Sequence, residues 1–138
     1  MDNGYLYRAK RTDTGEWVEG ALFDGEKYCI IGQRIKFSPY VENECKIVGY
    51  KVDRNTICRC TGHKDDKGKL IWEGDIIAFL DTYSTESGYA ENNCIGRVCW
   101  DDETLSFQVT DRLSAESYEV LQECRVIGNI YDDADLLE

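Results

Sequence analysis

Histidine, proline and long apolar runs are scarce in this chain of 138 residues, and each scarcity excludes something. The one histidine is His63 and the one proline is Pro39. The longest apolar run, residues 76–80, is far shorter than the roughly 20 residues that a membrane-spanning helix needs. The first residues lack the apolar segment of a secretion signal. We therefore expect a cytoplasmic protein with no membrane partner.

Basic residues are nearly missing from the last part of the chain, which has a net charge of −11 overall. Residues 101–138 carry 11 acidic side chains and only Arg112 and Arg125 as bases, whereas residues 1–100 carry 16 acidic and 14 basic side chains. Because affinity for phosphates comes mostly from clustered Lys and Arg, we expect no binding to duplex DNA. The sequence leaves open whether folding gathers Arg8, Lys10, Arg11, Arg54 and Arg59 on one side.

The residues that are present favour a globular β protein. Apolar residues make up 42% of the chain, and twelve glycines supply tight turns. Apolar and polar residues alternate with the period of two that is typical of strands. The predicted strands are Tyr5–Ala9, Trp17–Phe23, Lys27–Ile31, Arg34–Phe37, Lys46–Val52, Thr56–Cys60, Leu70–Trp72, Asp75–Leu80, Ile95–Trp100, Leu105–Val109 and Arg125–Tyr131.

Three polar segments interrupt this pattern. Thr82–Asn93 reads as a long, mobile hairpin loop. Ser114–Glu123 is compatible with a short helix capped by Ser114 or with a loop that leads into a strand. The tail from Asp132 fits one helical turn, with acids in its first turn. We also predict a boundary near Asn55, which separates an N-terminal β region (1–55) from a C-terminal unit (56–138).

The segment TGHKDDKGKLIWEGDII, Thr61–Ile77, is glycine-rich and charged but matches no ligand-binding loop. A phosphate-binding loop needs Ser or Thr after its lysine, and Lys69 is followed by Leu70. A calcium loop needs acidic or amide ligands where this segment has lysines. We interpret it as structural turns: Gly68 and Gly74 adopt conformations that a side chain disfavours, and Asp75 accepts backbone N–H groups.

The seven cysteines are expected to be free thiols, because their spacing is irregular and the expected compartment is reducing. Cys58 and Cys60 point to the same side of a predicted strand, so with nearby His63 they form the one candidate zinc site. A fourth ligand and a Cys-x-x-Cys knuckle are both missing, so we expect no metal and no other cofactor.

Three ordered motifs resemble the YopX family of phage and prophage proteins. They are the segment Thr61–Ile77, the segment IGRVCWDDETLSFQV (Ile95–Val109) and the ending CRVIGNIYDDADLLE (Cys124–Glu138). Gly74–Ile77 followed by Gly96–Trp100 is also a pattern that recurs in small SH3-like barrels. The resemblance implies such a barrel in residues 56–138 with an N-terminal β layer packed on it, and a phage or prophage origin. It supplies no activity and no catalytic residue.

A protein-interaction module is the leading functional hypothesis, and we predict no enzyme activity. Tyr83, Tyr89 and Tyr118 lie in polar segments and are the candidate contact residues. The partner would be a host or phage protein, and the chain itself a monomer or a small homo-oligomer. The alternatives are a nucleic-acid-associated protein, either an acidic DNA decoy or a single-strand binder, and an enzyme of unrecognised type.

Overall fold

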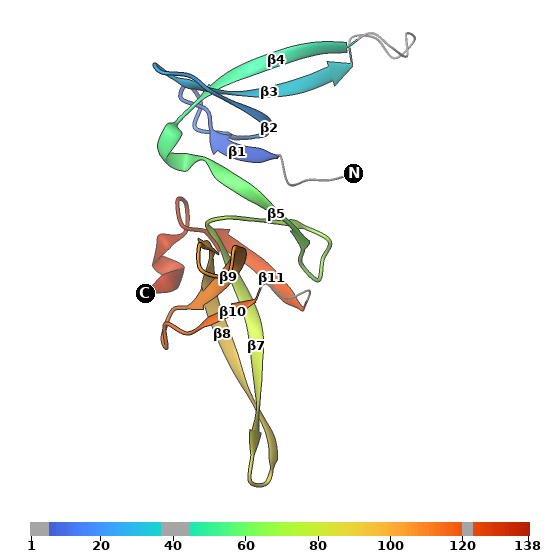
Figure 1. Ribbon diagram of the computed structural model, residues 1–138, viewed down its shortest axis with the longest axis vertical. Coiled ribbons are helices and arrows are strands. Elements are labelled where there is room, and N and C mark those ends of the chain that lie inside the picture. Colours follow the sequence, from blue (N-terminus) through green and yellow to red (C-terminus); the bar gives the residue numbers. More distant parts are fainter. Residues whose placement is uncertain (1–5, 37–44, 120–122) are drawn as a thin grey trace. The chain divides into compact units, whose positions relative to one another are not determined.

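Extended segments pair along most of the chain, as the period-two pattern of the sequence predicts. The computed structural model describes residues 6–36, 45–119 and 123–138. Within these residues the mostly-β prediction is confirmed, because antiparallel strands and two short 3₁₀ helices make up the regular structure. The elements in Figure 1 are β1 (Tyr7–Lys10), β2 (Trp17–Asp24), β3 (Cys29–Lys36), β4 (Cys45–Val52), η1 (Arg54–Thr56), β5 (Cys58–Lys64), β6 (Leu70–Trp72), β7 (Asp75–Thr85), β8 (Gly88–Asp101), β9 (Ser106–Asp111), β10 (Ser117–Glu119), β11 (Cys124–Asn129) and η2 (Ala134–Leu137).

Two compact units divide the chain, Met1–Cys60 and Thr61–Glu138. The boundary falls inside strand β5, a few residues after the predicted position near Asn55. In the described parts of both units, no helix has the length and apolar character to cross a membrane.

The first unit is a sheet in the strand order β4-β3-β2-β1-β5. Its core consists of four buried residues, with Tyr7, Val18, Leu22 and Ile57 packed against them. The buried residues are Ala9, Cys29, Ile31 and Val52. An isolated antiparallel bridge between Arg11 and Val52 brings the end of β1 to the end of β4. This bridge closes one corner of the unit and places the β1–β2 turn beside β4.

The second unit is a five-stranded antiparallel sheet in the order β10-β9-β8-β7-β11. Its core is a separate cluster of buried residues from five strands: Ile71, Ile77, Phe79, Val98, Val109 and Cys124. Strand β5 continues into this unit and is followed in the sheet order by β6. At the end of the chain, the acidic tail forms the 3₁₀ helix η2.

The closed SH3-like barrel predicted for residues 56–138 is not confirmed. The sheet of the second unit is open, with β10 and β11 at its two edges. Closure would require hydrogen bonds from strand to strand around the whole sheet. Strand β10 is only three residues long, and the residues that follow it, 120–122, lie outside the described part of the chain.

The predicted loop Thr82–Asn93 is wrong, because most of it forms strand. Strands β7 and β8 pair continuously from Ile76↔Arg97 to Thr85↔Gly88, and only Glu86 and Ser87 remain as the turn. Gly88 follows this turn with φ +133°, a conformation open to glycine. Pairing within the hairpin satisfies the peptide groups that face the opposite strand, so the segment is extended without an apolar face.

Two predicted strands, Lys27–Ile31 and Arg34–Phe37, are parts of one strand, β3, which begins at Cys29, because β4 pairs with it through Gly32 without interruption. Phe37, like Tyr5 of the first predicted strand, lies outside the described residues. Of the two alternatives for Ser114–Glu123, the described residues show the second, a turn that leads into strand β10, and Ser114 caps no helix. The Asp111 carboxylate accepts hydrogen bonds from the backbone N–H of Leu113 and the N–H and hydroxyl of Ser114, which fixes a turn before β10.

Candidate functional site

The distal half of the β7–β8 hairpin, residues 80–93, projects from the sheet as a two-stranded arm (Figure 1). Strand β11 pairs with β7 only at residues 75–79, and β9 pairs with β8 only at residues 96–101. Beyond those positions, no other described strand pairs with either edge of the hairpin. We call residues 80–93 the β7–β8 arm. Among the described strands its outer backbone groups have no partner, and an open strand edge of this kind can pair with another chain.

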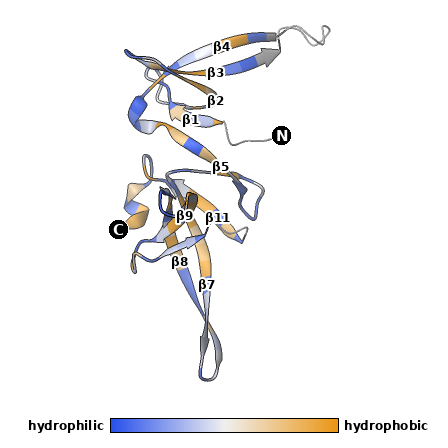
Figure 2. Ribbon diagram, in the orientation of Figure 1, coloured by the Kyte–Doolittle hydropathy of each residue, from blue (hydrophilic) through white to orange (hydrophobic). Residues whose placement is uncertain are grey.

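Hydropathy changes along this hairpin, as Figure 2 shows: the part inside the sheet is hydrophobic and the arm is mostly hydrophilic. Three large side chains nevertheless lie exposed on the arm, Leu80 (51% exposed), Tyr83 (45%) and Tyr89 (81%). Cross-strand pairing sets Ser84 opposite Tyr89 and Ala90 opposite Tyr83. Because side chains alternate between faces, Tyr83 and Tyr89 lie on opposite faces of the arm.

The arm carries charge of one sign. Asp81, Glu86 and Glu91 are its charged residues, and the sequence has no lysine or arginine from Leu80 to Gly96. A two-stranded hairpin without a packed face is only marginally stable on its own. The sheet at its base therefore holds the arm in place, and its acidic and aromatic side chains add little to either core.

Tyr118, the third candidate contact residue, lies at the base of the arm and is half-buried. Its ring packs edge-on against Phe79, with the centroids 5.2 Å apart. Its hydroxyl lies 2.9 Å from a carboxylate oxygen of Glu116 and 3.2 Å from one of Asp81. The Glu116 hydrogen bond, burial and the Asp81 carboxylate together raise the pKa of this phenol. Tyr118 thus fastens the first residues of the arm to β10.

Gly68, Gly74 and Asp75 are the residues predicted to shape turns. Gly68 has φ +79° and Gly74 has φ +87°, both in the left-handed region. The N–H of Gly74 donates to the Val98 carbonyl, and its own carbonyl accepts from Ile130. Asp75 is buried, and its carboxylate accepts the N–H of Trp72 at 2.8 Å.

A further organising residue, Asp65, was not singled out from the sequence. Its carboxylate accepts backbone N–H groups from Lys67 (3.0 Å), Lys69 (2.9 Å) and Val126 (3.0 Å). Burial alone would raise the pKa of this carboxyl, but the three N–H bonds outweigh it and the pKa is lowered. The Asp-x-x-Gly spacing to Gly68 is the signal for a turn of this kind.

The candidate zinc ligands do not gather around one point. Cys58 and Cys60 are buried, whereas His63 is exposed. Among the residues that the structure describes, no group of three or more His, Cys, Asp or Glu side chains could hold a metal ion.

The described cysteines form no disulfide, and two of those in the second unit have raised pKa values. Cysteines outside any disulfide are found at positions 29, 58, 60, 94, 99 and 124; the seventh, Cys45, lies where the structure describes no side chains. Burial, followed by the Asp65 and Asp66 carboxylates, raises the pKa of Cys124 to about 11. Burial and the Asp111 and Asp81 carboxylates also raise the pKa of Cys94. These two thiols stay protonated and are poor nucleophiles.

An antiparallel β protein of two units with a projecting acidic hairpin is the class that this fold and site define. The family described as YopX protein matches residues 6–138, so the chain belongs to the YopX family. The chain is also similar to the crystal structure of protein EF1440 from Enterococcus faecalis, with 28% sequence identity, a TM-score of 0.56 and 96% of each chain covered. A comparison with curated proteins gives no match.

Proposed function

We propose that this protein is a non-enzymatic accessory protein of phage or prophage origin that acts in the cytoplasm by binding another protein through the β7–β8 arm. The phage origin rests on the resemblance of its three motifs to a family of phage and prophage proteins. The binding role rests on one observation, the arm itself.

Both free edges of the arm and its exposed aromatic side chains suit a protein contact. An open strand edge adds a strand from a partner through backbone hydrogen bonds, and flanking side chains supply specificity. Tyr83 and Tyr89 offer large, amphipathic surface on the two faces of the hairpin. The arm also extends beyond the sheet of its own unit, so a partner can approach either face of the hairpin (Figure 1).

The charge of the arm supports a partner protein with a basic surface. Three carboxylates with no intervening cation create a field that steers a cationic surface toward the hairpin. The same field opposes pairing between the arms of two copies of this chain, because like charges would face one another. We therefore propose a basic host or phage protein as the partner and a monomer as the free state.

Reversing the charge of the arm should weaken this complex. The tagged full-length chain is incubated with lysate of its native host, captured proteins are identified by mass spectrometry, and the affinity of each purified candidate is measured. In the variant Glu86→Lys/Glu91→Lys, affinity should fall about tenfold or more at physiological salt, since two favourable charge contacts become repulsive. Melting temperature should stay within about 1 °C of the wild type, because both side chains are exposed.

A matched control is Glu103→Lys/Glu119→Lys, which makes the same charge change at exposed positions elsewhere in the second unit. A partner of the arm binds this control as tightly as the wild type. A captured protein that loses equal affinity for both variants would show attraction to overall charge, and the arm would not be the binding site. Tyr89→Ala, which keeps the charge, should also weaken a genuine arm complex.

Duplex DNA should not bind, and this outcome separates the proposal from its nucleic-acid alternative. The net charge of −11 opposes any approach to a phosphate backbone, and counterion release requires a cationic surface. Fluorescence anisotropy with labelled duplex DNA at low salt should show no saturable change. Low-micromolar binding that weakens steeply with added salt would contradict the prediction and favour a nucleic-acid-associated protein.

A further inference from the structure

A hollow lined by basic side chains lies in the first unit, and none of its residues belongs to the β7–β8 arm. It has a volume of about 420 Å³ and is bordered by the β1–β2 turn, the β2–β3 turn, the end of β4 and η1. Its charged residues are Lys10, Arg11, Lys27, Lys51, Arg54 and Asp53. We call this set the cationic hollow. Five cations and one carboxylate on a single concave surface favour an anion there.

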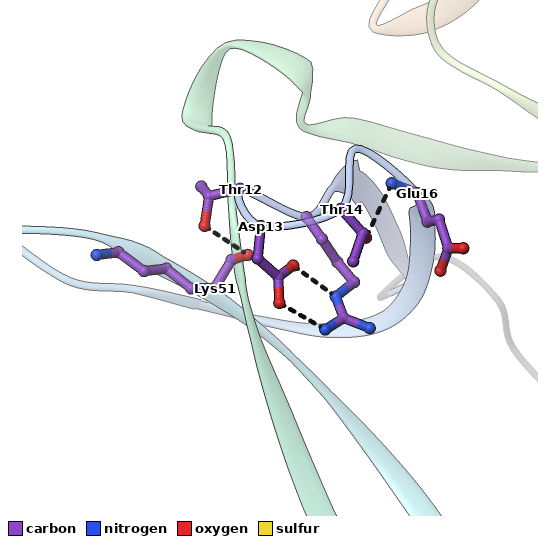
Figure 3. Close-up of polar contacts among 6 residues, drawn as sticks. Thr12, Asp13, Thr14, Glu16 and Lys51 are labelled. Carbon is purple, nitrogen blue, oxygen red and sulfur yellow. Dashed lines mark hydrogen bonds and ion pairs between the residues drawn. The ribbon is translucent and has the colours of Figure 1, made fainter.

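Folding rather than sequence proximity brings these cations together. The bridge between Arg11 and Val52 sets the β1–β2 turn against β4, and the Thr12 hydroxyl donates to the Lys51 carbonyl across this corner (Figure 3). In the same turn, the Thr14 hydroxyl accepts the N–H of Glu16. The backbone around Lys51 is thus held by the neighbouring turn.

Both arginines of the hollow are fixed in place. Arg11 donates two hydrogen bonds to Asp13, at 2.9 and 2.7 Å, and its guanidinium lies 4.6 Å from the Tyr50 ring centroid. Arg54 donates to Asp24 at 2.7 Å and to the Gly25 carbonyl at 2.7 Å. Each guanidinium has five N–H donors, and these bonds use two of them.

The lysines supply the net charge of the hollow, because Asp13 and Asp24 neutralise the two arginines. The Lys51 ammonium lies 4.7 Å from the Tyr28 ring centroid, and that of Lys10 lies 5.4 Å from the Trp17 ring. The carboxylate on the lining, Asp53, accepts the N–H of Asn55 at the start of η1.

Two exposed aromatic side chains, Phe23 and Tyr28, lie next to these cations, and we call the pair the aromatic wall. A second hollow of about 580 Å³ shares Lys27 and Tyr28 with the first, and its lining also includes Phe23, Asp24, Gly25, Glu26 and Ile30. The side chains of Phe23 and Tyr28 are 58% and 47% exposed. Exposed rings beside ammonium groups can stack on a planar group while the cations bind its phosphate.

From this juxtaposition we infer that the first unit binds a small ligand that joins a phosphate to a planar aromatic ring, the chemistry of a nucleoside monophosphate. The phosphate lies among Lys27, Lys51 and the two arginines, and the ring lies against Tyr28 and Phe23. The Glu26 carboxylate, beside the aromatic wall, can accept a ring N–H.

Charge distribution favours a small ligand over a nucleic-acid strand. Met1–Cys60 carries ten basic and nine acidic side chains, a net of +1, whereas Thr61–Glu138 carries six basic and 18 acidic ones, a net of −12. A long polyanion would extend beyond the first unit and be opposed by the net charge of −11 of the whole chain. A ligand with one phosphate responds mainly to the charges around it, because salt screens fields beyond about 8 Å at physiological ionic strength.

The test uses the full chain and two-dimensional amide NMR with four ribonucleoside 5′-monophosphates, a nucleoside without phosphate, and inorganic phosphate. We expect at least one monophosphate to bind saturably and to shift amides of residues 23–28 and 51–54. The nucleoside and inorganic phosphate should each bind about tenfold or more weakly, because each lacks one of the two recognised groups. Absence of saturable shifts with every monophosphate would overturn the inference.

Variants then locate the site. Lys51→Glu and Phe23→Ala should each weaken binding by about tenfold, and Lys46→Glu serves as the matched control. Lys46 is exposed on the same strand but does not line the hollow. Equal loss with Lys51→Glu and Lys46→Glu would overturn the assignment, as would a single-stranded oligonucleotide that binds more tightly than any monophosphate. Melting curves confirm that each variant is folded.

Discussion

Replacing Asp65 with alanine will lower the free energy of unfolding by about 3 kcal/mol, because three backbone N–H groups lose their acceptor. A partly buried donor without a partner costs roughly 1–3 kcal/mol, and two of the three can reach water after the change. The N–H of Val126 has the greatest effect, since it links strand β11 to the β5–β6 turn. Urea denaturation of the wild type and the variant measures the difference.

Asp66→Ala is the matched control. The neighbouring carboxylate of Asp66 makes an exposed ion pair with Arg125 at 3.4 Å, and its backbone N–H bond to the Cys124 carbonyl survives the substitution. An exposed pair of this kind contributes about 0–1 kcal/mol. If both variants lost the same stability, the three N–H bonds of Asp65 would not be the cause.

The contribution of Asp65 also has a defined pH dependence. Its folded-state pKa lies below the unfolded value, so the ionised carboxylate stabilises the fold above the unfolded pKa of about 3.9, and this contribution is lost as the pH falls through the folded pKa. The stability difference between the wild type and Asp65→Asn should therefore be largest near neutral pH and shrink in acid.

Gly74→Val will destabilise the protein by about 3–4 kcal/mol. A φ of +87° strains any residue with a Cβ, and strain of this type costs roughly 1–3 kcal/mol. A Cβ here would also lie 3.4 Å from Tyr131 and 3.5 Å from Ile130, so the two methyl groups of valine have little room. The measurement is thermal denaturation, where a change of this size lowers the melting temperature by roughly 10 °C.

The variant Gly68→Val separates the cost of backbone strain from the cost of crowding by neighbouring side chains. Gly68 has a similar φ of +79°, but a Cβ added there meets nothing within 4 Å. This variant should lose only the backbone part, about 1–2 kcal/mol. A Gly74→Val protein with no greater loss than Gly68→Val would show that Ile130 and Tyr131 move aside without cost.

Strands with one buried face were the most predictable part of the fold. The prediction Lys46–Val52 differs from β4 by one residue, because alternating burial marks each position of such a strand. The β7–β8 arm is predicted as a loop because neither of its faces is buried. Apolar and polar residues therefore do not alternate from Thr82 to Asn93. The arm is extended because its two strands pair with each other, and the strand propensities of its individual residues do not indicate that pairing.

The candidate sites were less predictable, because contacts distant in sequence create them. The Gly68 turn could be read locally, but the third N–H bound by Asp65 comes from Val126, 61 residues away. The sequence alone does not decide whether the five basic residues Arg8, Lys10, Arg11, Arg54 and Arg59 lie on one side of the protein. Folding brings Lys10, Arg11 and Arg54 to one hollow with Lys27 and Lys51, whereas Arg8 lies over Trp17 and Arg59 does not line the hollow.

Strand β5 makes the chain hard to divide into fragments. Each unit has its own core, but no linker joins them: Cys58 and Arg59 pair with β1, and the same strand runs on into the second unit. A fragment that ends before Cys58 would leave the edge of β1 uncovered. One that begins after Lys64 would lose the strand next to β6. Each fragment would expose a strand edge that favours aggregation, so the units are best studied together although their cores are separate.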